Sequence, residues 1–210
     1  MAYTQVSEIA KGQIRQANEQ LILEAAEKVF ARAGFGGATM AAIAKASGLP
    51  KANLHYYFGS KEILYRAVLA QILHDWLEPT AFITADAEPQ VAIEQYIRAK
   101  MALARLRPSG SKVFANELLH GAPVVKTLLE TDLRELVVSK AAVIQDWVDT
   151  GRMANVNGMH LFFTIWAATQ TYADFDVQVS AVLGQSELTA KDHDVAAEHV
   201  VSLMLRGCGL

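Results

Sequence analysis

Polar side chains suited to contacting DNA are gathered in one short segment of this sequence, residues 51–57. The segment offers one cation, one carboxamide, one imidazole and two phenols around a small alanine: Lys51, Ala52, Asn53, His55, Tyr56 and Tyr57. A carboxamide pairs with adenine through two hydrogen bonds, whereas ammonium and phenol groups reach phosphates and base edges. Carried on one side of a helix, these groups form a surface that suits a DNA groove.

The flanking residues predict the two helices that position this segment. Apolar spacing predicts a first short helix over about 39–46, a turn containing Gly48, and a second helix over about 51–57. The small core beneath them is expected to contain Ile43, Leu49, Leu54 and Phe58. Such a pair is typical of a helix-turn-helix, whose second helix enters the major groove. A helical corner with a solvated polar face shows the same apolar spacing, so the spacing alone leaves both interpretations open.

Helix-forming residues dominate the rest of the chain, which contains only five prolines. Apolar residues recur at helical spacing, and strand-like alternation is nearly absent. Helices are predicted over about 13–33, 39–46, 51–57, 60–83, 90–106, 110–119, 123–150, 158–183 and 189–206. The sequence therefore predicts an all-α protein with two domains. An amino-terminal three-helix domain containing the helix-turn-helix is expected over 1–59, and a second helical domain over 60–210.

Charge is unevenly distributed along the chain. Residues 1–66 hold eight Lys and Arg against five Glu, a net charge of +3, whereas residues 67–210 carry a net charge of −6. A basic first third on an acidic body suits a protein that meets a polyanion at one end. The amino terminus lacks the apolar core of a secretory signal, and the single cysteine cannot form an internal disulfide. The uncharged stretch 153–173 is too polar to span a membrane, so we expect a cytoplasmic protein.

Residues that would support catalysis or metal binding lack the partners they need. None of the six histidines forms an HExxH motif, and no Cys/His cluster has metal-ligand spacing. Cys208 lies near the chain end without a positioned base, and the glycines at 34, 36 and 37 lack the strand and the Lys-Ser/Thr of a phosphate-binding loop. We expect no catalytic residue, metal or cofactor. An all-α enzyme and a helical scaffold protein are the alternatives from other functional classes.

The segment 39–62, TMAAIAKASGLPKANLHYYFGSKE, closely resembles the DNA-binding domain of TetR-family transcriptional regulators. The matching positions are Thr39, Ile43, Ala44, Gly48, Leu54, Tyr57, Phe58, Ser60, Lys61 and Glu62. Two positions depart from the family pattern. Pro50 stands where the family usually has Ser or Thr; it is compatible with a first helical turn but offers no side-chain cap. His55 replaces the commoner Tyr.

The resemblance implies a role for each residue of the DNA-facing set. Phosphate contacts are implied for Thr39, Tyr57 and Lys61. An approach to base edges is implied for Lys51, Asn53, His55 and Tyr56, with Ala52 on the same face. Lys11 and Arg15 are expected to form a short arm over the DNA backbone, the alternative being an ordinary solvated helix start.

The acidic domain carries aromatic and amide side chains that suit a planar ligand. Trp166, Gln170 and Asp174 are four residues apart on one predicted helix. The Gln170 amide both donates and accepts, so its burial requires either an internal hydrogen bond or a ligand. The stretches HDWLEP, NELLHGAPVV, IQDWV and IWAATQTYADFDVQV resemble TetR-family regulators of pyrimidine utilisation, which implies uracil or thymine as the effector. Other small molecules are the alternative, since related regulators sense different compounds.

Recognition of a pyrimidine ring requires a flat aromatic wall and an amide that reads alternating donors and acceptors. Trp76, Trp166 and Tyr172 are candidates for the wall, and Asn116 and Gln170 for the edge.

The resemblance to this family also implies a homodimer. The helices at about 158–183 and 189–206 are expected to pack with their copies as a four-helix bundle, burying residues 161–168, Val195, Val200, Leu203 and Leu205. Two recognition helices on the order of 34 Å apart then face a near-palindromic operator in double-stranded DNA. Ligand binding is expected to change that spacing through the helix at 60–83. By family habit, the resemblance leads us to expect a repressor rather than an activator.

Overall fold

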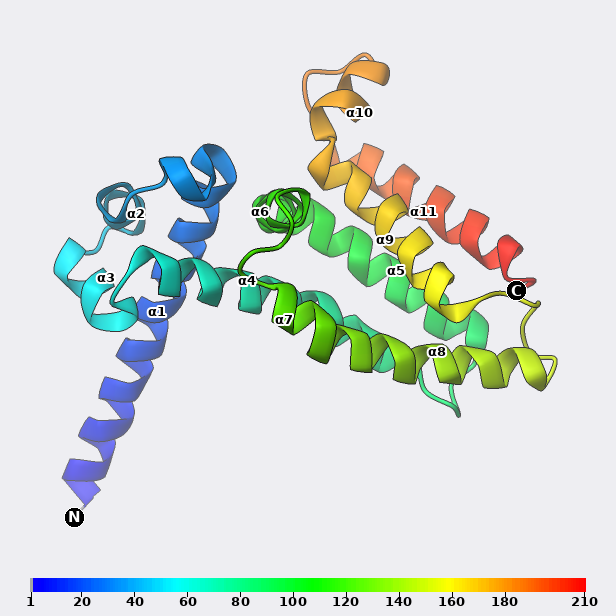
Figure 1. The fold of residues 1–210 in the computed structure, drawn as a ribbon, viewed down its shortest axis with the longest axis horizontal. Helices are drawn as coiled ribbons and strands as arrows, with labels where there is room; N and C mark the ends of the chain where they lie inside the picture. The colour runs from blue at the N-terminus through cyan, green and yellow to red at the C-terminus, as the bar shows by residue number, and fades with distance from the viewer. Residues whose placement is uncertain (1) are drawn as a thin grey trace. The chain divides into compact units, whose positions relative to one another are not determined.

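The computed structural model describes residues 2–210, with side chains from residue 12 onwards. All of its regular elements are helical, as the sequence predicts (Figure 1). The α-helices are α1 (Ala2–Gly37), α2 (Met40–Ser47), α3 (Lys51–Phe58), α4 (Lys61–Leu77), α5 (Pro89–Leu106), α6 (Pro108–Leu119), α7 (Lys126–Leu128), α8 (Arg134–Asp149), α9 (Gly158–Asp174), α10 (Asp176–Val182) and α11 (Ala190–Gly207). A 3-10 helix over Glu78–Phe82 follows α4, and a π-helix over Leu129–Leu133 joins α7 to α8.

Two predicted helices are shorter in the structure. The helix predicted over 60–83 ends as an α-helix at Leu77, because Pro79 lacks the backbone N–H needed to continue it. The helix predicted over 158–183 is interrupted at Phe175, whose φ of −119° and ψ of 32° are not helical. Asp176 lies in the first turn of α10, where an acidic side chain is favourable.

The chain divides into two compact units within α4, one ending at Gln71 and the other beginning at Ile72. The first half of α4 packs with the amino-terminal helices, since the Tyr65 ring contacts Phe30 edge-on with their centroids 4.8 Å apart. The predicted domain boundary between residues 59 and 60 precedes this helix, and as a functional boundary it stays a prediction.

The first unit is built on α1, which changes direction at Gly34, where φ is +65°. Its buried side chains come from all four helices of the unit: Ile22, Ala26 and Phe30 of α1, Ile43 of α2, Leu54 of α3, and Leu64, Val68 and Leu69 of α4. Ile43 and Leu54 are fully buried as predicted, whereas Leu49 and Phe58 are half-buried. This core holds α2 and α3 against α1.

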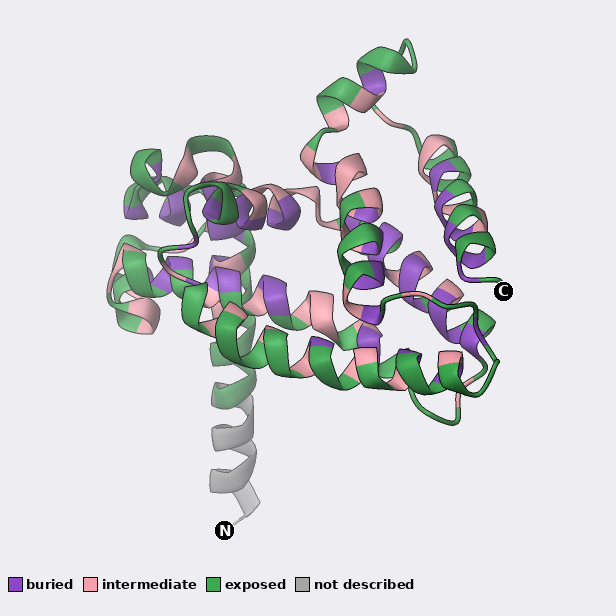
Figure 2. Cartoon of the chain, turned by 45° about the vertical axis from the view of Figure 1, so that its right-hand side comes forward, coloured by how far each residue is buried: buried purple, intermediate pink, exposed green. Residues whose placement is uncertain are grey.

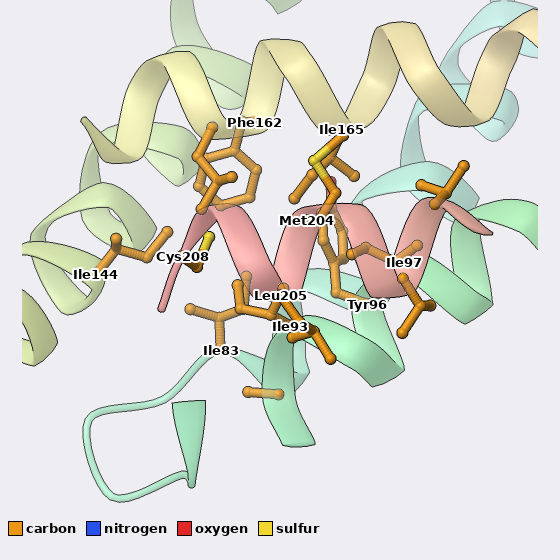
Figure 3. Close-up of a cluster of buried hydrophobic side chains, with 14 of the residues drawn as sticks. Ile83, Ile93, Tyr96, Ile97, Ile144, Phe162, Ile165, Met204, Leu205 and Cys208 are labelled. Carbon is orange, nitrogen blue, oxygen red and sulfur yellow. The ribbon is translucent and has the colours of Figure 1, made fainter. Parts of the chain in front are cut away.

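The second unit is a bundle in which α5, α9 and α11 lie side by side and α8 packs on α9 (Figure 1). Tyr96, Trp147 and Phe162 are the largest side chains in its core. In Figure 2, α11 carries buried residues along one side and exposed residues along the other. The buried side includes Met204 and Leu205, which, together with Cys208 directly after the helix, face the side chains of α5, α8 and α9 (Figure 3).

None of the described helices is long and apolar enough to cross a lipid bilayer.

Candidate functional site

Local backbone chemistry forms the helix-turn-helix of the first unit. The Thr39 hydroxyl accepts a hydrogen bond from the Ala42 N–H (3.1 Å) and so caps the start of α2. Gly48 ends α2 with a φ of +71°, a left-handed conformation that glycine adopts without steric cost. Pro50 then precedes α3 without a side-chain cap, as the sequence predicts. The turn therefore depends on a glycine at position 48.

The outward face of α3 presents most of the predicted base-reading side chains. Lys51, Ala52, His55 and Tyr56 are exposed, Tyr56 to 75%, whereas Asn53 is half-buried. The His55 Nδ1–H donates to the Gly59 carbonyl oxygen over 2.8 Å. Because a carbonyl only accepts, this bond places the proton of the neutral ring on Nδ1 and leaves Nε2 as an acceptor. The face therefore offers a cation, a phenol and an oriented imidazole.

A groove beside this face suits a phosphate backbone. It has a volume of about 360 Å³ and is lined by Gly12, Ile14, Arg15, Tyr56 and Tyr57. Tyr57 is held in place because its hydroxyl accepts a hydrogen bond from the Asn18 amide (3.2 Å). Arg15 is largely exposed and pairs with Glu19 over 3.0 Å. The predicted arm residue Lys11 lies outside the described side chains.

Two predicted phosphate contacts also have structural roles. The Lys61 ammonium donates to the carbonyl oxygens of Phe35 (2.8 Å) and Ala38 (3.1 Å) and lies over the Phe35 ring. These bonds join the start of α4 to the end of α1. Thr39 remains exposed while it caps α2. The sequence pattern does not predict the use of Lys61 to satisfy carbonyl groups at a helix end.

The second unit contains an apolar cavity of about 170 Å³. Its lining comes from α4, α5, α6, the π-helix and α9: Leu73, Trp76, Leu77, Lys100, Phe114, Leu118, Leu129, Leu133, Trp166 and Gln170. Three predicted ligand residues, Trp76, Trp166 and Gln170, are thus brought together. The other two are not: Asn116 is exposed on α6, and Tyr172 lines a separate, more polar hollow near Arg105 and His193.

The aromatic wall of the cavity is fixed by specific contacts. The Trp166 indole N–H donates to the Tyr96 hydroxyl over 2.7 Å, and Trp76 packs edge-on against Phe114 with ring centroids 5.0 Å apart. Gln170 is half-buried, and no hydrogen bond to its amide forms within the described residues. Gln170 therefore lines the cavity, and its role in ligand binding stays a prediction.

Lys100 is the ionisable residue among the cavity residues that were not predicted from the sequence. Its side chain is only 4% exposed, and burial lowers its pKa from 10.5 to about 7. The Nζ atom lies 4.3 Å from the centroid of the Trp76 ring, a cation–π contact. The sequence does indicate its burial, because Lys100 is four residues from Tyr96 and seven from Ile93 and so shares the buried side of α5 with them.

Comparison with known proteins places both units in one family. Residues 22–68 match the model for bacterial regulatory proteins of the tetR family, and residues 69–210 match the model for the carboxy-terminal region of YcdC-like protein. The chain is 42% identical over 191 residues to the HTH-type transcriptional regulator RutR of Escherichia coli (strain K12), covering 91% of this chain and 90% of that protein. It is 30% identical to the HTH-type transcriptional repressor NicS of Pseudomonas putida, covering 62% of this chain and 61% of that protein.

Solved structures show the same fold at lower identity. A TetR-like transcriptional regulator from Rhodococcus sp. RHA1 is similar with a TM-score of 0.64 at 21% identity, over 90% of this chain and 94% of that one. AibR, solved in complex with isovaleryl coenzyme A and operator DNA, has a TM-score of 0.66 at 19% identity, over 89% and 97% of the two chains. The two family matches, the 42% identity to RutR over 91% of the chain and the helix-turn-helix show that the chain belongs to the TetR family of bacterial transcriptional regulators.

Proposed function

We propose that this chain is a homodimeric, cytoplasmic repressor that binds a near-palindromic operator in double-stranded DNA through α3. A small planar effector, uracil or thymine, binds the cavity of the second unit and releases the operator. The observation that carries the proposal is the exposed polar face of α3 on a helix-turn-helix, in a chain 42% identical to RutR. RutR and NicS are transcriptional regulators, which supports a regulatory rather than an enzymatic function.

The chemistry of α3 supports base reading in a major groove. In the Nδ1–H tautomer, the Nε2 atom of His55 accepts a hydrogen bond, so it suits the amino group of cytosine or adenine. Lys51 and Tyr56 reach outward for phosphates or guanine acceptors, and Ala52 leaves room for the backbone to approach. Tyr57 and Arg15 line the adjoining groove and follow the phosphate chain.

The cavity supports an effector of single-ring size. Trp76 and Trp166 offer aromatic faces, and Gln170 offers a donor and an acceptor at one edge, as a uracil ring requires. Leu73, Trp76 and Leu77 belong to the last turns of α4, whose first turns pack in the DNA-binding unit. We infer that α4 transmits effector binding, and the coupling equals the effector's preference for one of two dimer states.

The outer side of α9 and α11 supports dimerisation. Phe163, Val195 and Leu203 are apolar and roughly half to two-thirds exposed in the single chain, and a second copy would cover them. Val200 and Leu205, which the sequence analysis assigns to the same interface, are buried in the chain's own core. The interface therefore uses fewer side chains of α11 than the sequence pattern indicates.

The test begins by selecting an operator from random double-stranded DNA with the wild-type protein. Affinity for the selected DNA is then measured for a variant combining Lys51→Ala and Tyr56→Ala, with Lys191→Ala, an exposed lysine of α11, as the matched control. Because each lost DNA contact weakens binding by about 1–3 kcal/mol, the double variant should lose at least roughly tenfold in affinity while the control keeps the wild-type affinity.

The affinity of the wild-type protein for DNA should fall steeply with salt, and uracil or thymine should release the DNA. Failure to enrich any sequence, or a flat salt response, would contradict the proposal.

A further inference from the structure

The cavity of the second unit contains an ionisable group that the fold itself leaves without a polar partner. Within the described residues, no hydrogen bond or ion pair reaches the Lys100 Nζ atom, although the side chain is 96% buried. Its contact with the Trp76 ring face, at 4.3 Å, compensates the charge only in part. A buried ammonium without an acceptor is costly, and folded proteins rarely retain one.

The surroundings of Lys100 explain why the group points to a ligand. The acidic residue acting on it is Asp174 of α9, whose carboxylate already accepts a hydrogen bond from the Ser111 hydroxyl and lies near Lys112. The remaining cavity residues on α4, α6, the π-helix and α9 are uncharged. A group entering the cavity therefore meets a cation whose three N–H donors are unused by the protein.

The volume of the cavity matches a ligand of one ring. A cavity on the order of 150 Å³ holds a benzene ring, and this one has about 170 Å³. Trp76, Phe114 and Trp166 supply aromatic surfaces for a flat ligand. A cationic ligand would be repelled by Lys100, and a purely apolar ring would leave the ammonium without an acceptor.

We propose that Lys100 determines the ligand specificity of this cavity by donating a hydrogen bond to an oxygen on the edge of a single planar ring. The oxygen is either a ring carbonyl or an oxyanion, and Gln170 contacts a second edge position. This inference rests on the proposed function in one respect, namely that the cavity is the effector site.

The test is calorimetric titration, without DNA, of wild-type protein, Lys100→Met and Lys191→Met. Methionine keeps the length of the lysine stem without the charge, and Lys191 is an exposed lysine that supplies the matched control.

Three probes are used: uracil for a ring carbonyl, benzoate for an oxyanion, and pyrimidine for a ring without oxygen. A hydrogen bond to a charged group changes a dissociation constant by roughly tenfold to a hundredfold. At least one oxygen-bearing probe should therefore bind wild type and Lys191→Met alike and lose that factor in Lys100→Met, whereas pyrimidine affinity should not change.

Each outcome decides the question. A loss confined to uracil assigns a neutral carbonyl ligand, and a loss confined to benzoate assigns an oxyanion. Equal affinities of wild type and Lys100→Met, an equal loss for pyrimidine, or no binding of either oxygen-bearing probe would overturn the inference. An unchanged circular dichroism spectrum of Lys100→Met establishes that the variant is folded. Operator binding is measured separately, so a protein that fails to bind DNA but binds a ring through Lys100 contradicts the proposed function alone.

A second readout in the same titration reports on the ammonium directly. Titrations at pH 8 in two buffers of different ionisation enthalpy count the protons exchanged on binding. An oxygen acceptor beside Lys100 favours its charged form, so wild type should take up a fraction of a proton with the ligand, while Lys100→Met should take up none. Equal proton uptake by the two proteins would count against the contact.

Discussion

Replacing Lys100 with methionine should stabilise the fold at low pH. Burial lowers the pKa of this lysine from 10.5 to about 7. Each pKa unit corresponds to about 1.4 kcal/mol, so protonating the amine costs on the order of 5 kcal/mol more in the folded state than in the unfolded state. The substitution also removes the cation–π contact with Trp76, which contributes roughly 0.5–2 kcal/mol. The net gain in the free energy of unfolding at pH 6 is therefore about 3 kcal/mol.

The gain should depend on pH in one direction. Between about pH 7 and 10.5 the unfolded chain keeps the lysine proton while the folded chain releases it, so the unfolded state binds more protons and wild-type stability rises with pH. The penalty is fully present below pH 7 and disappears as the pH rises through 10.5. The advantage of Lys100→Met should shrink by about 1.4 kcal/mol for each pH unit across this interval.

Urea unfolding of both proteins at pH 6, 7, 8 and 9, at one fixed protein concentration, measures this difference. Other titrating groups are common to both proteins and cancel when the two free energies of unfolding are subtracted. Lys191→Met supplies the control, because an exposed lysine should leave stability within about 0.5 kcal/mol of wild type at every pH. A pH-independent gap, or a Lys100→Met protein less stable than wild type at pH 6, would refute the reasoning.

Three further substitutions test the packing, each by urea unfolding. Gly158→Ala should lose about 1–3 kcal/mol, because the new Cβ lies 3.0 Å from the Cα of Ala141 on α8; unchanged stability would mean that the two helices separate freely. Gly48→Ala should lose about 1–2 kcal/mol through its φ of +71° alone, since no atom lies within 4 Å of the new Cβ, and a larger loss would indicate a clash. Tyr96→Phe should lose about 1–3 kcal/mol by leaving the Trp166 indole N–H without its acceptor, and an unchanged tryptophan emission spectrum would contradict that bond.

The helix-turn-helix could be predicted from sequence because its determinants are local. A cap at Thr39, a left-handed glycine at position 48 and apolar residues four apart specify two short helices within 24 residues. The interruption at Phe175 was not predicted, since the apolar pattern continues through it. Of the residues at the interruption, Asp176 favours a new helix start, because an acidic side chain in the first turn of α10 is favourable.

The cavity could be predicted only in part because its residues come from five separate elements. Trp166 and Gln170 share one face of α9, so helical spacing alone relates them to each other. Asn116 has suitable chemistry, but it lies on the exposed side of α6, which spacing alone did not distinguish. Lys100 was passed over because lysine is usually exposed, and only the packing of α5 against its neighbours buries it.

The same property of Lys100 that lowers stability suits the residue to sensing. An amine whose folded-state pKa lies near 7 is only partly charged at neutral pH. An acceptor oxygen in the cavity accepts a hydrogen bond from this amine and favours its charged form, which burial disfavours. A methionine at this position removes the penalty but also the donor, leaving an apolar cavity that no longer discriminates rings by their oxygens. Stability and ligand affinity should therefore change in opposite directions in one variant, a combination that a purely structural role for Lys100 does not produce.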